Sequence, residues 1–560
     1  DGSDTYSVGV LKSTDGGNSW STTGLTWTVN QGRTISRILV NPSNSQIVMA
    51  FASNGTWRST NGGSTWTQIN TTPCKDAEFK PGDPNTVYAA GTAFRRSTDG
   101  GATWTNISLP LTGIGRLAIA VSPANSAYVY LLAANNSDSG YRGLMRSTDS
   151  GATFSTRSTS PNILGWDNGA DSGGQGWYDL AIAVSPTNAN EVFTGGVNIW
   201  RSTDGGTNWT LNSHWYGGYS KPYVHADIHD LIFLPGSGTT IYSGHDGGVS
   251  RTTNNGTSYS DITANLTIAQ QYKISQSTST SNLILAGHQD NGTNRLSGTT
   301  WSERMGGDGM DCYIDRTNDN FMIGSLYYGD YYRSTNGGGS FSNIADPAVE
   351  GEWVSVIHQD PVTAATVYAG GRPALYRTTN IAAGTVSWSA LSTPPGTGSI
   401  INFAIAPSNN QIIYCLKTGS GGVSKSTNAG SNFTSLTNPT TGVAPTSVAI
   451  SNTNPDVAFV TYSGYSATNK VFRTTNGGTS WTNISTGLPN VPVNCVVYDN
   501  NSTQDAIYVG TDIGVFYRDN TTGWIEFSNG LPRTEVSDLE IFYPTGRLRA
   551  ATFGRGTWDS

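Results

Sequence analysis

An eight-residue pattern that recurs along the chain constrains its fold more than any other feature of the sequence. It reads STDGGNSW at 13–20, and close variants occupy 59–66, 97–104, 147–154, 202–209, 252–259, 334–341, 426–433 and 474–481. A stretched variant, TTNIAAGTVSW, covers 378–388. Most copies are about 40–55 residues apart, which is the period of a propeller blade and not of a helical solenoid. The repeat therefore predicts an all-β chain built from a series of similar small sheets.

The residues around one copy predict the strands of one such sheet. Within 34–70, four short segments have strand character, namely ISRILVNP, QIVMAFA, GTWRST and STWTQI. The first is a nearly continuous apolar run, as expected for a strand that is buried on both faces. The eight-residue pattern then forms the turn between the third and fourth strands. There Asp or Asn bonds its own backbone and Gly adopts positive φ.

This repeated turn resembles the Asp-box, S/T-x-D/N-x-G-x-x-W/F, of sialidases, sortilin-type receptors and xyloglucan-degrading glycosidases. Its copies extend along nearly the whole chain. The resemblance implies a β-propeller fold. It says little about function, because an Asp-box is a turn that stabilises a blade far from any chemistry.

The order of the predicted strands sets the number of propellers. Residues 8–20 supply a third and a fourth strand with no first or second strand before them, so the chain would begin in the middle of a blade. The last segment, 537–560, has a first, second and third strand but no fourth. Adding about one and a half blades upstream gives two tandem seven-bladed β-propellers with Asp-box turns. The first covers 1–265 and is incomplete at its N-terminus, and the second covers 266–560.

Composition and charge exclude several classes of partner. The formal net charge is −8, charged residues make up 12% of the chain, and no Lys/Arg run occurs. These values argue against nucleic acid and anionic membrane. No apolar stretch is long enough to span a bilayer. Because Asp1 opens directly into polar sequence, we expect a mature exported chain whose signal has been removed. The four cysteines form no CxxC pair and are expected to be buried free thiols.

Two long loops between predicted sheets, 157–177 and 211–228, are rich in Trp, Tyr, Gly and Asp. Irregular loops on a rigid scaffold commonly carry binding and catalytic residues. The Trp and Tyr rings of these two loops can stack on the flat apolar faces of sugars, or they can pack locally and cover the top of the propeller. The residues predicted to bind a glycan are Trp166, Trp177, Trp215, Tyr216, Tyr327, Tyr328, His288 and Asp512.

The segment YVHADIHD, 223–230, contains a candidate metal site. His225, Asp227 and His229 alternate, so in an extended chain their side chains point the same way. Two imidazoles and a carboxylate on one face can bind a divalent metal or tune a catalytic carboxylate. The alternative is a hydrogen-bonded polar cluster that closes the mouth of the propeller.

Several acids gather in successive loops of the same region. Asp246 lies in GHDGG, Asp290 in GHQDNG, and Asp308 and Asp311 in GGDGMD. These repeats straddle the predicted boundary between the propellers, and a cleft between domains is a preferred place for a ligand. Asp in a Gly-rich turn is also ordinary turn chemistry. The accumulation of acids on neighbouring repeats favours a catalytic role for Asp246, Asp290, Asp308 and Asp311.

A second resemblance is more specific. GTDIGVFYR at 510–518 and GHDGGVSR at 244–251 are similar to the T-D-V/I-G-G-x-Y-R stretch of inverting xyloglucanases. In this sequence Asp512 falls late in the second propeller, and Val515 stands where the second Gly is expected. The resemblance implies tandem propellers with two catalytic aspartates facing each other across the cleft between them, one acid and one base. The overall layout also resembles large exported Asp-box propellers of Bacteroidota.

These features support two hypotheses from different classes. The first is a secreted or cell-surface glycoside hydrolase of endo-glucanase or xyloglucanase type. It would act on a polysaccharide by the inverting two-aspartate mechanism and require no cofactor beyond the candidate metal. The second is a non-catalytic carbohydrate-binding adhesin, or a structural component of a surface assembly that contacts other surface proteins. A sialidase is disfavoured because most Arg residues stand directly before the repeated turn and form no visible triad.

Overall fold

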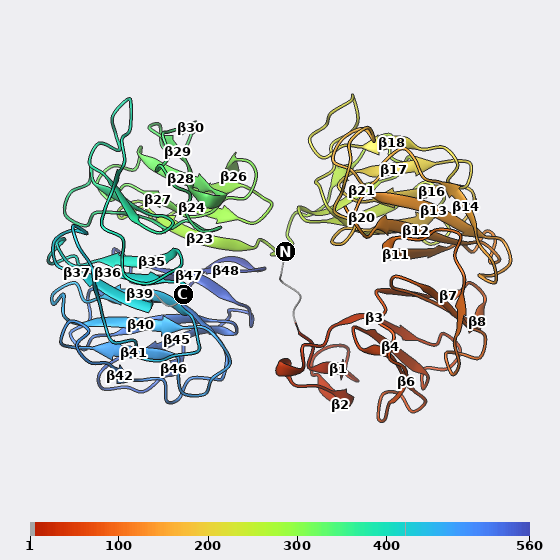
Figure 1. Ribbon diagram of the computed structural model, residues 1–560, viewed down its shortest axis with the longest axis horizontal. Coiled ribbons are helices and arrows are strands. Elements are labelled where there is room, and N and C mark those ends of the chain that lie inside the picture. Colours follow the sequence, from red (N-terminus) through yellow and green to blue (C-terminus); the bar gives the residue numbers. More distant parts are fainter. Residues whose placement is uncertain (1–5, 420–421) are drawn as a thin grey trace. The chain divides into compact units, whose positions relative to one another are not determined.

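The computed structural model describes residues 6–419 and 422–560, and the chain forms two compact units, Asp1–Leu266 and Thr267–Ser560. Both units consist of short antiparallel sheets in which each strand pairs with the next strand along the chain (Figure 1). The prediction of an all-β chain is therefore confirmed. Within the described residues, helix is limited to two short 3₁₀ segments, η1 (Val29–Gln31) and η2 (Tyr327–Gly329).

Unit 1 contains, over residues 6–266, one two-stranded sheet and five four-stranded sheets. The sheets are β1 (Gly9–Lys12) and β2 (Ser21–Thr26); β3 (Ile35–Val40), β4 (Val48–Ala52), β5 (Gly55–Ser59) and β6 (Thr67–Asn70); β7 (Asp76–Lys80), β8 (Asp83–Ala90), β9 (Phe94–Ser97) and β10 (Thr105–Ile107); β11 (Ile114–Val121), β12 (Val129–Asn135), β13 (Tyr141–Ser147) and β14 (Ser155–Ser158); β15 (Ala181–Val184), β16 (Val192–Gly195), β17 (Ile199–Ser202) and β18 (Thr210–Ser213); and β19 (Ile228–Phe233), β20 (Ile241–His245), β21 (Gly248–Thr252) and β22 (Ser260–Asp261).

Unit 2 contains, in the part of it that is described, six four-stranded sheets and one three-stranded sheet. The sheets are β23 (Gln271–Gln276), β24 (Leu283–His288), β25 (Thr293–Ser297) and β26 (Thr300–Met305); β27 (Cys312–Ile314), β28 (Met322–Leu326), β29 (Asp330–Ser334) and β30 (Ser342–Asn343); β31 (Ile357–Gln359), β32 (Val367–Gly370), β33 (Leu375–Thr378) and β34 (Ser389–Ala390); β35 (Ile400–Ile405), β36 (Ile413–Lys417), β37 (Gly422–Ser426) and β38 (Thr434–Ser435); β39 (Pro445–Ile450), β40 (Ala458–Tyr462), β41 (Val471–Thr474) and β42 (Thr482–Asn483); β43 (Val493–Tyr498), β44 (Ile507–Thr511), β45 (Gly514–Arg518) and β46 (Ile525–Glu526); and β47 (Val536–Phe542), β48 (Arg547–Thr552) and β49 (Gly556–Asp559).

The first strands of the sheets surround the centre of each unit. In unit 1, β3, β7, β11, β15 and β19 follow one another around a cavity of about 610 Å³. In unit 2, β23 packs against both β27 and β47, so the first and last sheets are neighbours. Apolar side chains such as Leu117, Leu131 and Phe94 fill the space between successive sheets. This arrangement is that of a β-propeller, in which sheets packed face to face surround a central axis.

Acidic side chains tie neighbouring first strands together. Asp76 accepts the backbone N–H of Ile119 in β11 at 2.7 Å. Asp311 accepts the N–H of Ile357 in β31 at 2.9 Å. Because these first strands share no ladder of hydrogen bonds with each other, the carboxylates satisfy N–H groups that would otherwise be buried without an acceptor.

The repeated eight-residue segments lie in the turns between third and fourth strands. In the copy at 147–154, Asp149 Oδ1 accepts the Ser147 hydroxyl at 2.7 Å and the Thr153 N–H at 2.9 Å. The Ser147 hydroxyl oxygen accepts the N–H of Gly151, which has φ 77°. Hydrogen bonds from Thr153 and Ser147 lower the pKa of Asp149 to about 2. The turn is thus closed by local bonds that an ionised Asp strengthens.

The cysteines are as the sequence predicts, since Cys74, Cys312, Cys415 and Cys495 are buried free thiols. No helix among the described residues has the length and apolar character needed to cross a membrane.

Candidate functional site

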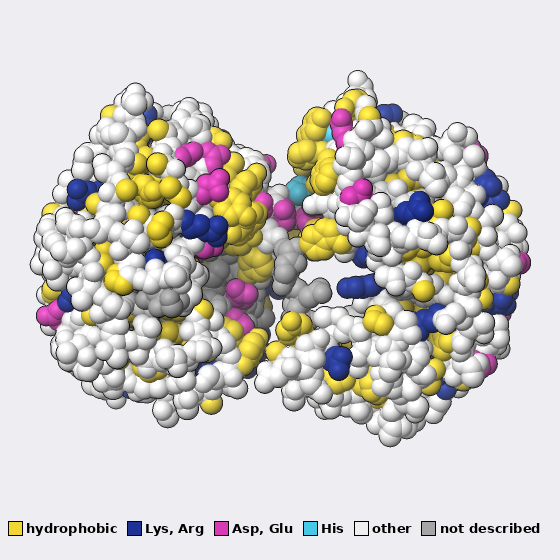
Figure 2. Space-filling view, in the orientation of Figure 1, with side chains coloured by type: hydrophobic (Ala, Val, Ile, Leu, Met, Phe, Trp, Pro, Cys, Tyr) yellow, Lys and Arg dark blue, Asp and Glu magenta, His cyan; other side chains and the backbone are white. Residues whose placement is uncertain are grey.

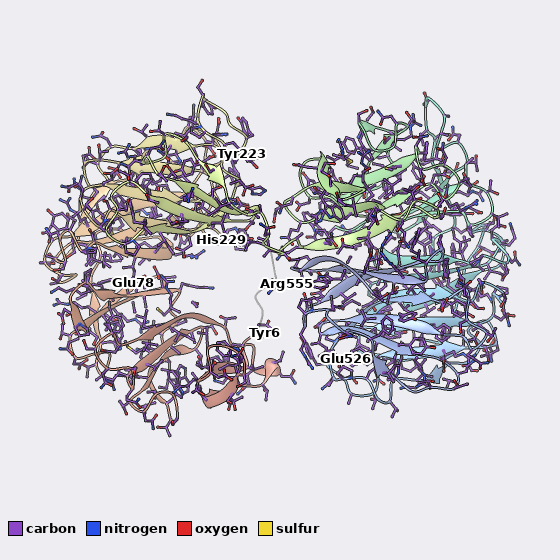
Figure 3. All side chains as sticks on the ribbon, turned by 180° about the vertical axis from the view of Figure 1, so that it is seen from behind. Tyr6, Glu78, Tyr223, His229, Glu526 and Arg555 are labelled. Atoms are coloured by element: carbon purple, nitrogen blue, oxygen red, sulfur yellow. The ribbon has the colours of Figure 1, made fainter. Side chains whose placement is uncertain are left out.

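Asp246 is the centre of a polar cluster that includes His229, a residue lining the central cavity of unit 1. Its Oδ1 lies 2.6 Å from Nε2 of His229, and its Oδ2 accepts the Tyr178 hydroxyl at 2.8 Å. His229 stands on β19 and lines the cavity, where Figure 3 labels it together with Glu78 of β7. The side chain of Asp246 is 11% exposed. Two hydrogen-bonding neighbours therefore hold a carboxylate in a fixed position with limited access to solvent.

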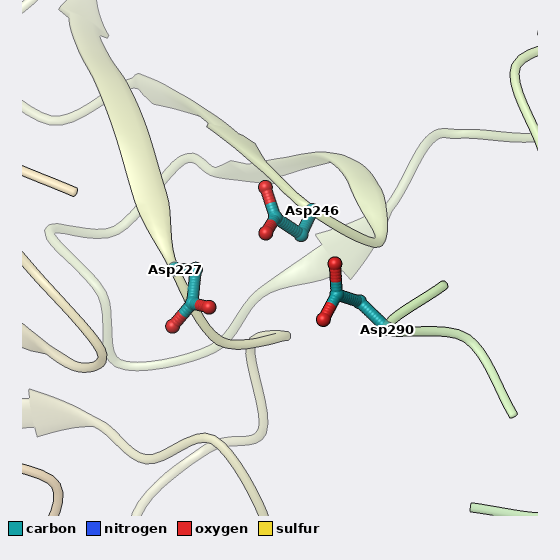
Figure 4. A group of neighbouring side chains, drawn as sticks. All are labelled: Asp227, Asp246 and Asp290. Carbon is teal, nitrogen blue, oxygen red and sulfur yellow. The ribbon is translucent and has the colours of Figure 1, made fainter. Parts of the chain in front are cut away.

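Asp227 lies beside Asp246 at the start of β19 (Figure 4). Their carboxylate oxygens come within 4.8 Å of one another, and Gln175 Nε2 donates to Asp227 Oδ1 at 3.0 Å. Burial raises the pKa of Asp227, and the charge of Asp246 raises it further. Burial and the neighbouring charge therefore favour the protonated form of Asp227.

Asp179 is a member of this cluster that the sequence did not indicate. It precedes β15, its side chain is 0% exposed, and neither carboxyl oxygen has a hydrogen-bond partner among the residues that the structure describes. Burial, followed by the charge of Asp227, raises the pKa of Asp179 to about 9. An acid placed directly after two aromatic residues and before a buried strand is the only sequence signal for it. That signal is weak because Asp76 and Asp311 also lie at the start of a first strand, where they accept backbone N–H groups instead.

The predicted metal ligands do not share one face. Asp227 has φ 64°, so the chain is not extended through it and the alternation of His225, Asp227 and His229 is broken. His229 pairs with Asp246, whereas the ring of His225 stacks on that of His245 with centroids 5.7 Å apart. Among the described residues the three predicted ligands do not converge within 4.8 Å. Metal binding by this set stays a prediction.

The aromatic residues of the two long loops lie on the surface of unit 1 near β18 and β20, where Figure 2 shows hydrophobic, acidic and His side chains close together. Trp215 Nε1 donates to the carbonyl oxygen of Trp166 at 2.9 Å, so the loops 157–177 and 211–228 are joined. The His214 ring, which is fully buried, packs against Tyr216 at 4.2 Å between centroids. Exposed apolar rings include Trp166, Trp177, Trp215, Tyr216, Tyr219 and Tyr223. These rings both pack locally and remain accessible.

In unit 2 the structure brings Asp290 and Asp308 together, whereas Asp311 does not have the catalytic role expected of it. Asp308 Oδ1 accepts the N–H of Asp290, which has φ 56°, at 2.7 Å. Asp311 is 5% exposed, and both its oxygens accept backbone N–H groups, those of Cys312 and Ile357. These bonds commit Asp311 to joining first strands, so the expectation of a catalytic role for it is corrected.

His288 also differs from the expectation of a glycan-binding residue. It is 5% exposed, and its two ring nitrogens lie 3.0 Å from Gln271 Nε2 and 3.1 Å from Asn294 Nδ2. Burial lowers the pKa of His288 to about 4. A neutral, buried imidazole with both nitrogens engaged cannot stack on a sugar, and the sequence could not show this burial.

Asp512 is a hydrogen-bonded carboxylate of unit 2. It accepts hydrogen bonds from Asn494 Nδ2 at 3.0 Å and from the Tyr465 hydroxyl at 3.4 Å. Burial raises its pKa. Burial and then the charge of Asp512 raise the pKa of Glu535, so these two carboxyls influence each other. Asp512 therefore remains a candidate binding residue, with Glu535 as a neighbour that the sequence did not indicate.

Tyr327 and Tyr328 form an exposed aromatic platform with Trp353, a residue that sequence reasoning missed. The rings of Tyr327 and Trp353 stack with centroids 5.3 Å apart and an interplanar angle of 6°. Trp353 Nε1 donates to the Tyr272 hydroxyl at 3.2 Å, which fixes the indole. A cavity of about 300 Å³ beside the two tyrosines is also lined by Asp330. A flat apolar surface next to an acid suits a sugar ring and its hydroxyls.

These sheets and loops define the class of the protein, which is a β-propeller with acidic and aromatic loops. Among solved structures, the chain is similar to the GH74 enzyme of Niastella koreensis, with 19% identity and a TM-score of 0.65, over 98% of this chain and 86% of that one. It is also similar to the GH74 xyloglucanase from Xanthomonas campestris, with 15% identity and a TM-score of 0.67, over 97% and 85%. An ancestral GH74 enzyme has 16% identity and a TM-score of 0.57, over 100% and 94%. At these identities the likeness shows the fold. No protein-family model matches the chain, and no curated protein does either.

Proposed function

We propose that this protein is a polysaccharide-directed glycoside hydrolase of the β-propeller type, built as two seven-bladed propellers with Asp-box turns and active outside the cell. The observation that carries the proposal is the Asp246 cluster. It combines a fixed carboxylate, a second acid with a raised pKa and nearby exposed aromatic rings. The similarity of the fold to GH74 enzymes, one of them a xyloglucanase, supports the choice of substrate class.

Asp246 is proposed as a catalytic carboxylate. The neighbouring His229 and the donating Tyr178 hydroxyl hold its two oxygens in place, which suits a general base. An inverting mechanism needs two carboxyl groups about 6.5–9.5 Å apart, with a water between them. Asp227 is the neighbouring acid within unit 1, with a carboxylate oxygen within 4.8 Å of one of Asp246. Asp227, Asp290 and Asp308 are the candidates for the general acid, and mutagenesis decides between them.

The test is a polysaccharide panel, including xyloglucan and other plant and algal glucans, scored for newly released reducing ends. Asp246→Asn is expected to lower release at least 100-fold on the substrate that wild type cleaves, because the base is lost. Asp227→Asn, Asp290→Asn and Asp308→Asn identify the general acid in the same assay. Asp204→Asn is the matched control, since Asn occupies that turn position in other copies of the repeat. Full activity of Asp246→Asn would refute the proposal that the active site contains Asp246.

The second candidate function is carbohydrate binding without turnover. It is favoured by the stacked pair Tyr327 and Trp353, whose exposed rings form a flat surface independent of any acid pair. Retention of wild type on one immobilised polysaccharide, with no release of reducing ends from any polymer, would select this function over the hydrolase.

A further inference from the structure

The turn Gln175–Asp179 directs three polar side chains toward one place in unit 1. The N–H of Asp179 donates to the carbonyl oxygen of Gln175 at 3.0 Å, so the side chains at 178 and 179 each lie next to that of Gln175 on this single helical turn. Gln175 Nε2 reaches Asp227, and the Tyr178 hydroxyl reaches Asp246. The carboxyl of Asp179 therefore points toward the same two acids.

Asp179 is unlike the other acids next to first strands. Asp76 and Asp311 are also partly or fully buried, but each accepts backbone N–H groups from its own strand and from the neighbouring one. Within the described part of the chain, neither oxygen of Asp179 accepts a hydrogen bond, and its side chain is 0% exposed. A buried carboxyl with both oxygens unsatisfied indicates that a bound water or ion completes the site.

The surroundings of Asp179 favour an ion over a water. Asp227 and Asp246 both act on Asp179 with negative charge, so Asp179 either keeps a proton or exchanges it for a cation, and a water does neither. Arg116 is the positive group that acts on Asp179. Its Nη1 donates to the carbonyl oxygens of Trp177 and Tyr178, at 3.0 and 2.8 Å, which anchors the loop. A cation between the carboxyls offsets the charge directly.

We propose that unit 1 binds one divalent cation of the calcium type between Asp179 and Asp227, with the amide oxygen of Gln175 as a third protein ligand. Hard cations select carboxylate and amide oxygens. Because Gln175 Nε2 bonds Asp227, its Oε1 is the atom left for the cation. Asp246 remains held by His229 and Tyr178. This set of oxygens differs from the imidazole-containing set His225, Asp227 and His229, which would suit zinc.

The test uses the full chain, freed of metal with a chelator and titrated with Ca²⁺, Mg²⁺ or Zn²⁺ by calorimetry. We expect one Ca²⁺ per chain, with Kd roughly 10⁻⁴–10⁻³ M or tighter. Saturating Ca²⁺ is expected to raise a thermal unfolding midpoint by roughly 5 °C. Asp179→Asn and Asp227→Asn should each weaken Ca²⁺ binding at least tenfold, whereas Asp204→Asn, which lies in a repeated turn, should bind as wild type does.

Three results would overturn the site: no Ca²⁺ binding and no midpoint shift in wild type, full Ca²⁺ affinity in Asp227→Asn, or zinc binding that needs His225 and His229 but not Asp179. If Asp179→Asn does not fold, Tb³⁺ luminescence of wild type, excited through nearby Trp177 and Tyr178, replaces that variant. Displacement by Ca²⁺ is then expected in wild type and loss of signal in Asp227→Asn. These readouts are independent of polysaccharide cleavage, so either proposal can fail alone.

Discussion

Replacing Asp149 tests how the repeated turn stabilises its sheet. Its Oδ1 accepts the N–H groups of Ala152 and Thr153 at 3.0 and 2.9 Å, and its Oδ2 accepts the Thr153 hydroxyl at 2.6 Å. The residue is exposed, so solvent replaces part of what is lost. By analogy with helix caps, Asp149→Ala should lower the free energy of unfolding by roughly 1–2 kcal/mol at pH 7. Asp149→Asn keeps an acceptor oxygen and should cost less, because Asn fills this position at Asn61 and elsewhere.

The pH dependence of this variant series has a defined sign. The folded pKa of Asp149 is lowered from 3.8 to about 2. The stabilisation by the ionised form is therefore complete above the unfolded pKa and lost as the pH falls from about 5 to about 1. About half of it should be gone at pH 3. Asn does not titrate, so the advantage of wild type over Asp149→Asn should shrink between pH 7 and pH 3.

Urea unfolding followed by tryptophan fluorescence, at pH 7 and pH 3, measures these differences for wild type and both variants. Wild type should be the most stable and Asp149→Ala the least stable at pH 7. The explanation fails if Asp149→Asn lowers the free energy of unfolding as much as Asp149→Ala does at pH 7. It also fails if the difference in unfolding free energy between wild type and Asp149→Asn is the same at pH 3 as at pH 7.

Two further predictions concern residues that the sequence assigned to function. Asp311→Ala should destabilise unit 2 by roughly 2–3 kcal/mol, because the N–H groups of Cys312 and Ile357 lose their acceptor, and chemical unfolding checks this; a stability equal to that of wild type would contradict it. Trp215→Ala should weaken retention on a bound polysaccharide roughly tenfold in affinity electrophoresis, whereas the control Trp20→Ala, in a repeated turn, should not; equal effects of both variants would contradict a specific role for Trp215.

The sequence predicted best those features whose hydrogen bonds are local. In the repeated turn, Ser147 bonds Asp149 and Asp149 bonds Thr153, so the donors and acceptors lie within four residues of each other. The apolar first strands were also readable as strands, but the expected burial on both faces holds for β15 and is wrong for β3, where Ile38 and Val40 are 47% and 53% exposed. For these reasons the all-β chain of short sheets and the placement of its turns could be predicted without coordinates.

The candidate site was predicted only in part because its contacts join distant segments. The sequence indicated Asp246 as one of several acids on neighbouring repeats, but its partners His229 and Tyr178 come from 17 and 68 residues away. The alternation of His225, Asp227 and His229 assumed an extended backbone, which the positive φ of Asp227 breaks. His288 and Asp311 were selected for their residue type, and burial gives them other roles.

Asp179 shows why residue type and position are not sufficient to assign a role. It shares its place before a first strand with Asp311, yet the neighbouring strand supplies an N–H to Asp311 and none to Asp179. The difference arises from the turn that begins at Gln175, which directs Asp179 toward Asp227 and Asp246. A buried carboxylate that joins strands is stabilised by backbone N–H donors, whereas a carboxylate that faces other acids is stabilised only by a bound proton or cation. The same side chain can therefore stabilise the propeller in one sheet and form a binding site in another.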